Sequence, residues 1–135
     1  MSNSRTGYSG KPLYQKLGLK DSTSFFLINA PEDYTKWLEC DFEVPKGNPP
    51  FDLIHIFSDE SIQLEKWVQK YLPALDQNGA IWISWPKKAA KVPTDITEDT
   101  VRAIIFPLGM VDVKVCSVSP VWSGLKVVIR KENRK

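Results

Sequence analysis

Short apolar runs recur along this chain, and each is followed by a segment of mixed polarity. The runs are residues 24–30 (SFFLINA), 51–57 (FDLIHIF) and 80–85 (AIWISW). Apolar runs of this length are typical of strands that are covered on both faces of a sheet. Residues 41–44 (DFEV) predict one more short strand, before the prolines of residues 45–50 interrupt regular structure.

Helical spacing appears between these runs. Residues 31–39 (PEDYTKWLE) predict a helix, because proline suits a first turn and acids favour a helix N-terminus. Pro73 predicts that the next helix is kinked or ends locally, and Gly79 is a suitable stop beyond it. The apolar residues of that helix stand three or four positions apart, as on one helix face: Leu64, Trp67, Val68, Tyr71, Leu72 and Leu75.

A third helix is predicted after residue 94. Asp95, with Glu98 three residues later, resembles a capping box, in which two side chains bond to backbone N–H groups at a helix start. Gly109 is a natural residue for the C-terminus of this helix. Its apolar residues repeat the helical spacing: Val101, Ile104, Ile105 and Leu108.

The end of the chain has a different pattern, in which apolar and polar side chains alternate. Residues 111–118 (VDVKVCSV) and 125–131 (LKVVIRK) both indicate half-buried strands, and the turn residues between them predict an antiparallel pair. Three strand–helix units and a hairpin predict an α/β protein. We expect a three-layer Rossmann-like sheet, mostly parallel, with a C-terminal antiparallel hairpin.

The 135 residues are enough for one domain with a full core. We expect a single α/β domain over residues 24–135. Residues 1–23 are expected to form an N-terminal arm that docks on the domain through Leu13 and Leu17.

Composition gives little support to nucleic-acid binding, membrane insertion or metal binding. Lys and Arg number 18 against 16 Asp and Glu, a net charge of +2 that is too balanced to indicate nucleic acid by itself. No apolar run approaches the roughly 20 residues that cross a bilayer, and the first ten residues do not resemble a signal peptide. The isolated Cys40 and Cys116 favour a reducing cytoplasm. We expect no metal site, because the only histidine, His55, has no ligand-spaced partner.

Two segments carry a resemblance to a known superfamily. FDLIHIF (51–57) is similar to a middle strand of class I methyltransferase-like Rossmann folds, and LPALDQNGAIWIS (72–84) is similar to the helix end, glycine turn and strand that follow it. With the closing antiparallel pair, the resemblance covers residues 24–131. It implies a truncated methyltransferase-like fold.

A second resemblance spans nearly the whole chain. It is to a bacterial family, the domain of unknown function numbered 3052. No activity comes with this resemblance. The motifs that carry it are GYSGKPLYQKLG, FDLIHIF, SWPKK, VPTDITED, VDVKV and WSGLKVVIRK.

The methyltransferase resemblance implies a glycine-rich turn after the first strand, where the backbone approaches adenosylmethionine. Here that strand ends NAPEDY, without glycine, and Pro31 removes a backbone donor. The resemblance also implies an acid at the end of the second strand, and Glu43 is the only nearby candidate. We therefore expect no cofactor.

Ligands of parallel α/β sheets bind beyond the carboxyl ends of the strands. Polar and aromatic residues of the segments expected there are the candidate ligand-binding residues, together with Trp122 of the hairpin turn. No catalytic residue is assigned. The candidates are Asn29, Ser58, Trp85, Lys87, Lys88, Asp95 and Trp122.

The loop that contains Lys87, Lys88 and Lys91 has two interpretations. These lysines could hold a phosphate or carboxylate, but Asp95, Glu98 and Asp99 follow closely and cancel their charge. Mutual pairing on the surface is the simpler interpretation.

Three further residues carry a functional and a structural alternative. His55 is expected to be a packed, hydrogen-bonded core histidine rather than a general base. Cys116 lacks a motif that would place a base beside it. Trp122 is either a packed residue or an interaction anchor.

The leading hypothesis is a small, non-catalytic binding or regulatory module on a degenerate methyltransferase-like scaffold. One alternative is an enzyme that uses the loop after residues 80–85, and a weaker one is nucleic-acid binding through the basic tail and Lys114, Lys126 and Arg130. As partners, the sequence leaves open a small anionic ligand, another protein or a second copy of the chain. It gives no support for a membrane contact.

Overall fold

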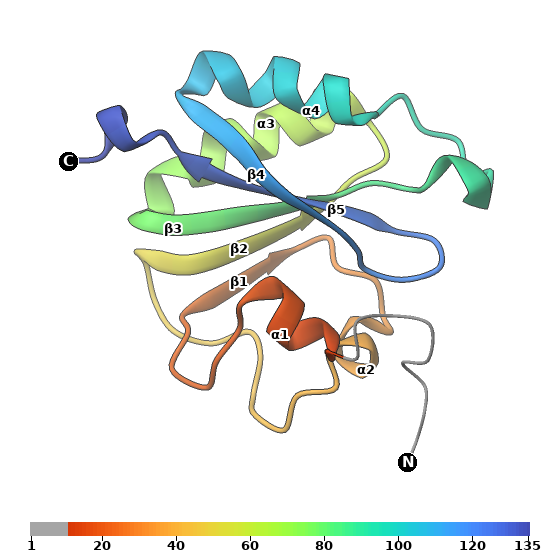
Figure 1. Cartoon of the computed structure of the whole chain (residues 1–135), viewed down its shortest axis with the longest axis horizontal. Helices are drawn as coiled ribbons and strands as arrows, with labels where there is room; N and C mark the ends of the chain where they lie inside the picture. Colours follow the sequence, from red (N-terminus) through yellow and green to blue (C-terminus); the bar gives the residue numbers. More distant parts are fainter. Residues whose placement is uncertain (1–10) are drawn as a thin grey trace.

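The computed structural model describes residues 11–135, which form one five-stranded sheet with helices on both faces (Figure 1). The strands are β1 Phe25–Ile28, β2 Phe51–Phe57, β3 Leu75–Ser84, β4 Met110–Ser117 and β5 Ser123–Ile129. The α-helices are α1 Leu13–Leu17, α2 Tyr34–Leu38, α3 Ser61–Tyr71 and α4 Glu98–Ile105. Short 3-10 helices cover Leu72–Ala74, Lys88–Ala90, Phe106–Leu108 and Lys131–Asn133.

The strand order is β1-β2-β3-β5-β4. β1, β2 and β3 are parallel, whereas β5 runs antiparallel to both β3 and β4. The predicted fold class is therefore confirmed, with a sheet that is mixed. Since Ile83 near the end of β3 pairs with Leu125 near the start of β5, the β4–β5 turn lies at the carboxyl edge of the parallel strands.

The sheet separates two hydrophobic cores. α3 and α4 cover one face, with Leu64 and Val68 of α3 fully buried beside Ile105 of α4. α1 and α2 cover the other face, where Trp82 is fully buried. Trp85, which directly follows β3, belongs to the first core. Trp82 and Trp85 therefore pack on opposite faces of the sheet, because residues three positions apart on an extended chain point to opposite sides.

The arm that precedes β1 packs against the second core. Leu13 and Leu17 are both buried, as predicted, and the indole Nε1 of Trp82 donates a hydrogen bond of 3.0 Å to the carbonyl of Leu17. This bond satisfies a donor that would otherwise be buried without a partner. The part of the arm before residue 11, with the GYSG that opens the motif GYSGKPLYQKLG, lies outside the described residues.

Two predictions before β2 are wrong. Residues 41–44 form no strand: their acids alternate with half-buried side chains, and only Lys46 pairs with β1, in an isolated bridge to Phe25. The helix expected over 31–39 is shorter and begins at Tyr34, because a turn closed by the Tyr34 amide and the Pro31 carbonyl (3.0 Å) comes first.

β3 begins five residues earlier than its apolar run. Leu75 pairs with Phe51 of β2, because Pro73 ends the preceding helix and frees the chain to extend. Gly79 is therefore inside a strand and does not stop the helix. A Cβ there would lie 2.8 Å from the carbonyl oxygen of Asp52, so glycine permits the close approach of β2.

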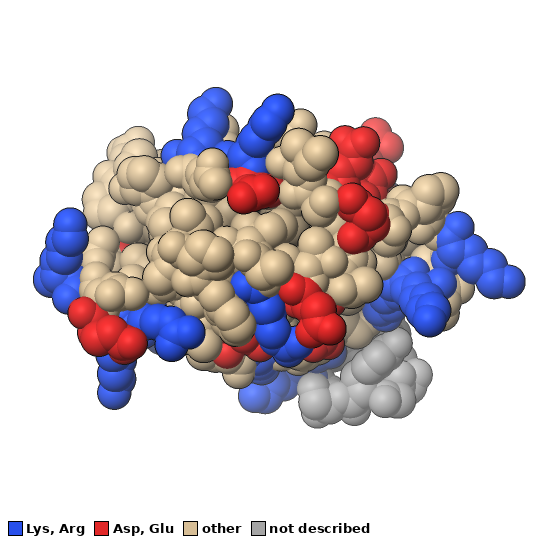
Figure 2. Space-filling view, turned by 90° about the horizontal axis from the view of Figure 1, so that it is seen from above, with Lys and Arg blue, Asp and Glu red and all other residues tan. Residues whose placement is uncertain are grey.

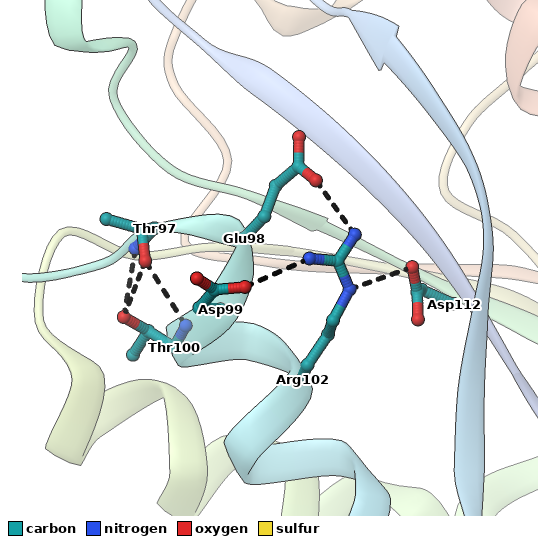
Figure 3. A network of polar contacts seen from close by, with 6 residues as sticks. All are labelled: Thr97, Glu98, Asp99, Thr100, Arg102 and Asp112. Carbon is teal, nitrogen blue, oxygen red and sulfur yellow. Dashed lines mark hydrogen bonds and ion pairs between the residues drawn. The ribbon is translucent and has the colours of Figure 1, made fainter.

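The N-terminus of α4 is capped by a pair of residues other than the predicted one. Thr97 and Thr100 form the capping box, and Gly109, with φ of +82°, ends the helical region as predicted. One turn into α4, Arg102 forms ion pairs with Glu98, Asp99 and Asp112, the last of which belongs to β4 (Figure 3). Arg102 thus fastens the helix to the outermost strand.

Candidate functional site

The carboxyl ends of β1, β2 and β3 place Asn29, Ser58 and Trp85 at one edge of the sheet, as expected. Asn29 has a left-handed φ of +59°, and its Nδ2 donates a 3.0 Å hydrogen bond to the carbonyl of Phe57. Asparagine adopts this backbone conformation more readily than most residues other than glycine. The result is a direct link between the ends of β1 and β2.

Ser58 and Trp85 are both buried. The amide of Ser58 donates to the carbonyl of Ser84 (3.0 Å), and its hydroxyl donates to the carbonyl of Glu60 (2.9 Å). The carbonyl of Trp85 accepts from the amide and the hydroxyl of Ser123. These groups therefore join the strand ends to one another and to β5.

Lys87, Lys88 and Asp95 do not converge. The ammonium of Lys87 donates to the hydroxyl of Ser117 on β4, whereas Lys88 is exposed in a 3-10 turn. The carboxylate of Asp95 accepts from the amide and the hydroxyl of Ser61, each at 2.7 Å. Asp95 therefore caps α3, a helix distant in sequence, and these two bonds lower the pKa of its carboxyl.

Trp122 is half-buried in the β4–β5 turn. Its ring meets the ring of Phe57 edge-to-face with centroids 5.1 Å apart, and its backbone forms a bridge with Pro86. The tryptophan therefore packs across the end of β2 and fixes the position of the turn relative to β3.

His55 lies at the centre of a buried polar chain. Its Nδ1 is hydrogen-bonded to the hydroxyl of Tyr34 (2.7 Å) and its Nε2 to the hydroxyl of Ser84 (2.8 Å). Burial lowers the pKa of His55 to about 3, and burial raises the pKa of Tyr34. His55 is thus a neutral, satisfied core residue, which confirms the structural alternative.

Both cysteines are half-buried and free. Burial raises the pKa of Cys116, although the charges of Lys16, Lys114 and Lys87 oppose this rise. A thiol held protonated is a poor nucleophile. Within residues 11–135, no group of three or more His, Cys, Asp and Glu side chains is placed to hold a metal ion. In the same range every helix is too short or too polar to span a bilayer.

The corner after β1 does not suit adenosylmethionine as the resemblance implies. β1 is an edge strand, so no neighbouring strand among the described residues supplies the expected acid, and Glu43 is exposed on an irregular segment. The turn itself has no glycine, and its first side chain, Asn29, is bonded to the end of β2. The residues present therefore do not fit this cofactor in its usual place.

A pocket of about 310 Å³ lies instead on the α1 and α2 side of the carboxyl edge. α1 and the residues before it contribute Lys11, Leu13 and Lys16, and α2 with the residue after it contributes Lys36, Trp37 and Glu39. The β4–β5 turn closes the third side with residues 117–120. This is the concave surface that a ligand at this edge would meet.

Sequence reasoning missed the lining of this pocket. The docking of Leu13 and Leu17 was predictable from the sequence. Lys16 stands three residues after Leu13 on the same short helix, so its position near the sheet could also have been predicted. That the β4–β5 turn would meet α1 and α2 was not, because no local pattern records a contact between segments so far apart.

No protein-family model and no curated protein matches the sequence. Solved structures do match. A SAM dependent methyltransferase from Aquifex aeolicus has a TM-score of 0.60 at 13% identity, over 87% of this chain and 88% of that one.

Two further structures have similar scores. A Sulfolobus solfataricus protein provisionally described as a type 11 methyltransferase gives a TM-score of 0.53 at 15% identity, over 90% and 79% of the two chains. LepI in complex with SAM gives 0.52 at 13% identity, over 87% of this chain and 39% of LepI. Identities this low show the fold alone: the chain has a methyltransferase-like Rossmann fold.

Proposed function

We propose that the chain is a non-catalytic binding or regulatory module on a methyltransferase-like scaffold that does not hold adenosylmethionine in the usual corner. The observation that carries this proposal is the hydrogen bond from Asn29, just after the edge strand β1, to the carbonyl of Phe57 at the end of β2. A side chain occupies the turn where a cofactor needs free backbone, and the strand that would supply its ribose contact is replaced by one bridge at Lys46.

Calorimetric titration with adenosylmethionine and its demethylated product tests the proposal. We expect no heat of binding at micromolar concentrations. Backbone amide NMR signals of Asn29, Ala30, Glu32 and Asp33 provide a local readout, and they should not shift. Micromolar binding with shifts at these residues would return the protein to the class of methyl-transfer enzymes.

An enzyme of methyltransferase-related chemistry is the second candidate. The extent of the match to the Aquifex aeolicus enzyme, 88% of that chain, favours it. Among the residues expected from sequence, we keep Lys87 for a role in ligand binding, because its ammonium reaches the wall of the pocket through Ser117. Methyl transfer requires the cofactor, so the same titration separates the two candidates.

We further propose membership of the bacterial family numbered 3052, and a cytoplasmic location. The motifs quoted above support the first, and two free half-buried thiols support the second. We also propose residues 24–135 as the domain and 1–23 as its arm. Because Leu13 and Leu17 are buried, deletion of residues 1–23 is expected to lower the melting temperature by exposing the second core.

A further inference from the structure

We propose that the pocket between α1, α2 and the β4–β5 turn binds a small organic phosphate, with the phosphate among the lysines and an apolar or aromatic body against Trp37. This inference rests on the proposed function, because it assigns a site and a ligand class to a binding module. None of the lysines that line the pocket was among the candidates expected from sequence.

Charge is the first argument. Four charged side chains line the pocket: Lys11, Lys16, Lys36 and Glu39. Their net charge of +2 equals that of the entire chain of 135 residues. The face over α3 and α4 differs, because there acidic and basic side chains are interspersed (Figure 2). Asp33 lies outside the lining and pairs with Lys36 at 3.6 Å, so three lysines face two acids around this concave site. The remaining positive charge favours an anion there.

A further lysine stands behind the wall. The ammonium of Lys87, in the loop after β3, donates to the hydroxyl of Ser117, which lines the pocket. The positive charges of Lys16 and Lys87 both act on the thiol of Cys116, which neighbours Ser117 on β4. The electric fields of Lys16, on α1, and of Lys87, in the loop after β3, therefore overlap at the end of β4 that lines the pocket.

Apolar side chains form a large part of the remaining wall, and packing holds them in place. Leu13 and Val118 are buried, and Trp37 is half-buried with one part left to the pocket. Trp37 meets the ring of Tyr34 edge-on, with centroids 6.4 Å apart, and Tyr34 is fixed by its bond to His55. An aromatic surface that is already positioned binds a flat group with little loss of side-chain entropy.

Size decides between a small molecule and a polymer. Pockets for small ligands span about 300 to 1,000 Å³, so a pocket of about 310 Å³ holds one head group and one ring. Nucleic acid needs a groove that follows several phosphates along the backbone. We therefore assign the site to a phosphate monoester rather than to a nucleic acid.

Phenyl phosphate is the probe for the experiment, with phenol and inorganic phosphate as its separate halves. Backbone and indole NMR signals of the ¹⁵N-labelled full chain are followed during titration at low salt. We expect shifts centred on Lys16, Trp37 and Ser119, and phenyl phosphate is expected to bind more tightly than either half. Added salt should weaken this binding, since the lysines are partly exposed.

Charge-reversal variants locate the site. Lys16→Glu and Lys36→Glu are each expected to weaken phenyl phosphate binding about tenfold or more, because attraction is replaced by repulsion. Lys66→Glu is the matched control: it changes the same charge on an exposed residue of α3, on the other face, and should leave binding unchanged. Equal melting temperatures of the variants exclude a folding defect.

Any of three outcomes of the phenyl phosphate titrations would overturn the inference. They are the absence of shifts at millimolar phenyl phosphate, shifts confined to other surfaces, and equal losses in Lys36→Glu and Lys66→Glu. Binding of a single-stranded oligonucleotide without binding of phenyl phosphate would also overturn it and would favour a nucleic acid. Adenosylmethionine in a parallel titration distinguishes the two proposals, because shifts at Asn29 to Asp33 would contradict the proposed function and leave the phosphate site intact.

Discussion

The hydroxyl of Tyr34 and the Nδ1 of His55 lie 2.7 Å apart inside the second core, and this bond joins α2 to the middle of the sheet. His55 continues the chain to Ser84 on β3. Within residues 11–135 no buried side-chain nitrogen or oxygen lacks a partner, so the loss of one group from this chain leaves another unsatisfied.

Tyr34→Phe is therefore expected to destabilise the protein by about 1–3 kcal/mol, because Nδ1 of His55 loses its partner in a dry core. Urea unfolding followed by tryptophan fluorescence measures the change. Tyr71→Phe is the matched control, since the Tyr71 ring is half-buried against Phe26, and it should change the free energy of unfolding by less than about 0.5 kcal/mol. Equal effects of the two changes would argue against the hydrogen-bonded chain.

Stability should depend on pH through His55. Its pKa is about 3 in the folded protein and 6.5 in the unfolded chain, so the unfolded chain binds a proton first as the pH falls. The contribution of His55 to stability is thus present above pH 6.5 and decreases by about 1.4 kcal/mol per pH unit from there down to about pH 3. Between pH 7 and 5 the expected loss is about 2 kcal/mol.

Urea unfolding at several pH values between 7 and 5 checks this slope, in a range where most carboxylates stay ionised. His55→Asn lacks the titrating ring, so it should lower the stability but flatten its pH dependence. A variant that keeps the slope of the unaltered protein would assign the titration to another group.

Asp95→Ala is expected to lower the melting temperature by a few degrees, because α3 loses the cap at its N-terminus. Circular dichroism during heating measures this. Asp59→Ala removes an exposed acid two residues before Ser61 and serves as a control for charge alone. A similar decrease in both variants would mean that charge near α3, and not the two bonds to Ser61, is responsible.

The three acids around Arg102 should differ in importance (Figure 3). The side chain of Asp112 is 20% exposed and that of Asp99 is 95% exposed. Water and salt screen the exposed pair, so Asp112→Asn should lower the melting temperature clearly and Asp99→Asn hardly at all. Differential scanning calorimetry of both variants at two salt concentrations checks the order. The reverse order would show that α4 is not held to β4 through Asp112.

Much of the fold could be predicted because its core elements carry unambiguous patterns. All residues of the run FDLIHIF except Asp52 are buried in β2, and Val101, Ile104 and Ile105 are buried in α4. Residues 41–44 mislead because a short alternation of acids and apolar residues is satisfied equally well by an irregular segment. Gly79 misleads for another reason, since the close approach of β2 is a tertiary constraint.

The site was less accessible to sequence reasoning. The carboxyl edge could be placed, and Asn29 does lie there, but its bond to Phe57 depends on the distance between two strands. Asp95 illustrates the same limit. Its spacing to Glu98 suggests a local cap, whereas its carboxylate caps a helix that begins 34 positions earlier. Local patterns predict elements, and contacts between elements decide what each polar group does.

The position of β1 at the border of the sheet limits how this protein could be redesigned. Replacing residues 30 and 31 by glycine would loosen one turn, yet a grafted nucleoside would still lack a neighbouring strand on its outer side. Within residues 11–135, β1 is the border strand, and its bridge from Phe25 to Lys46 lies at the opposite end of the strand. Methyl-donor chemistry would have to be introduced as a whole additional strand, inserted between Leu38 and Phe51.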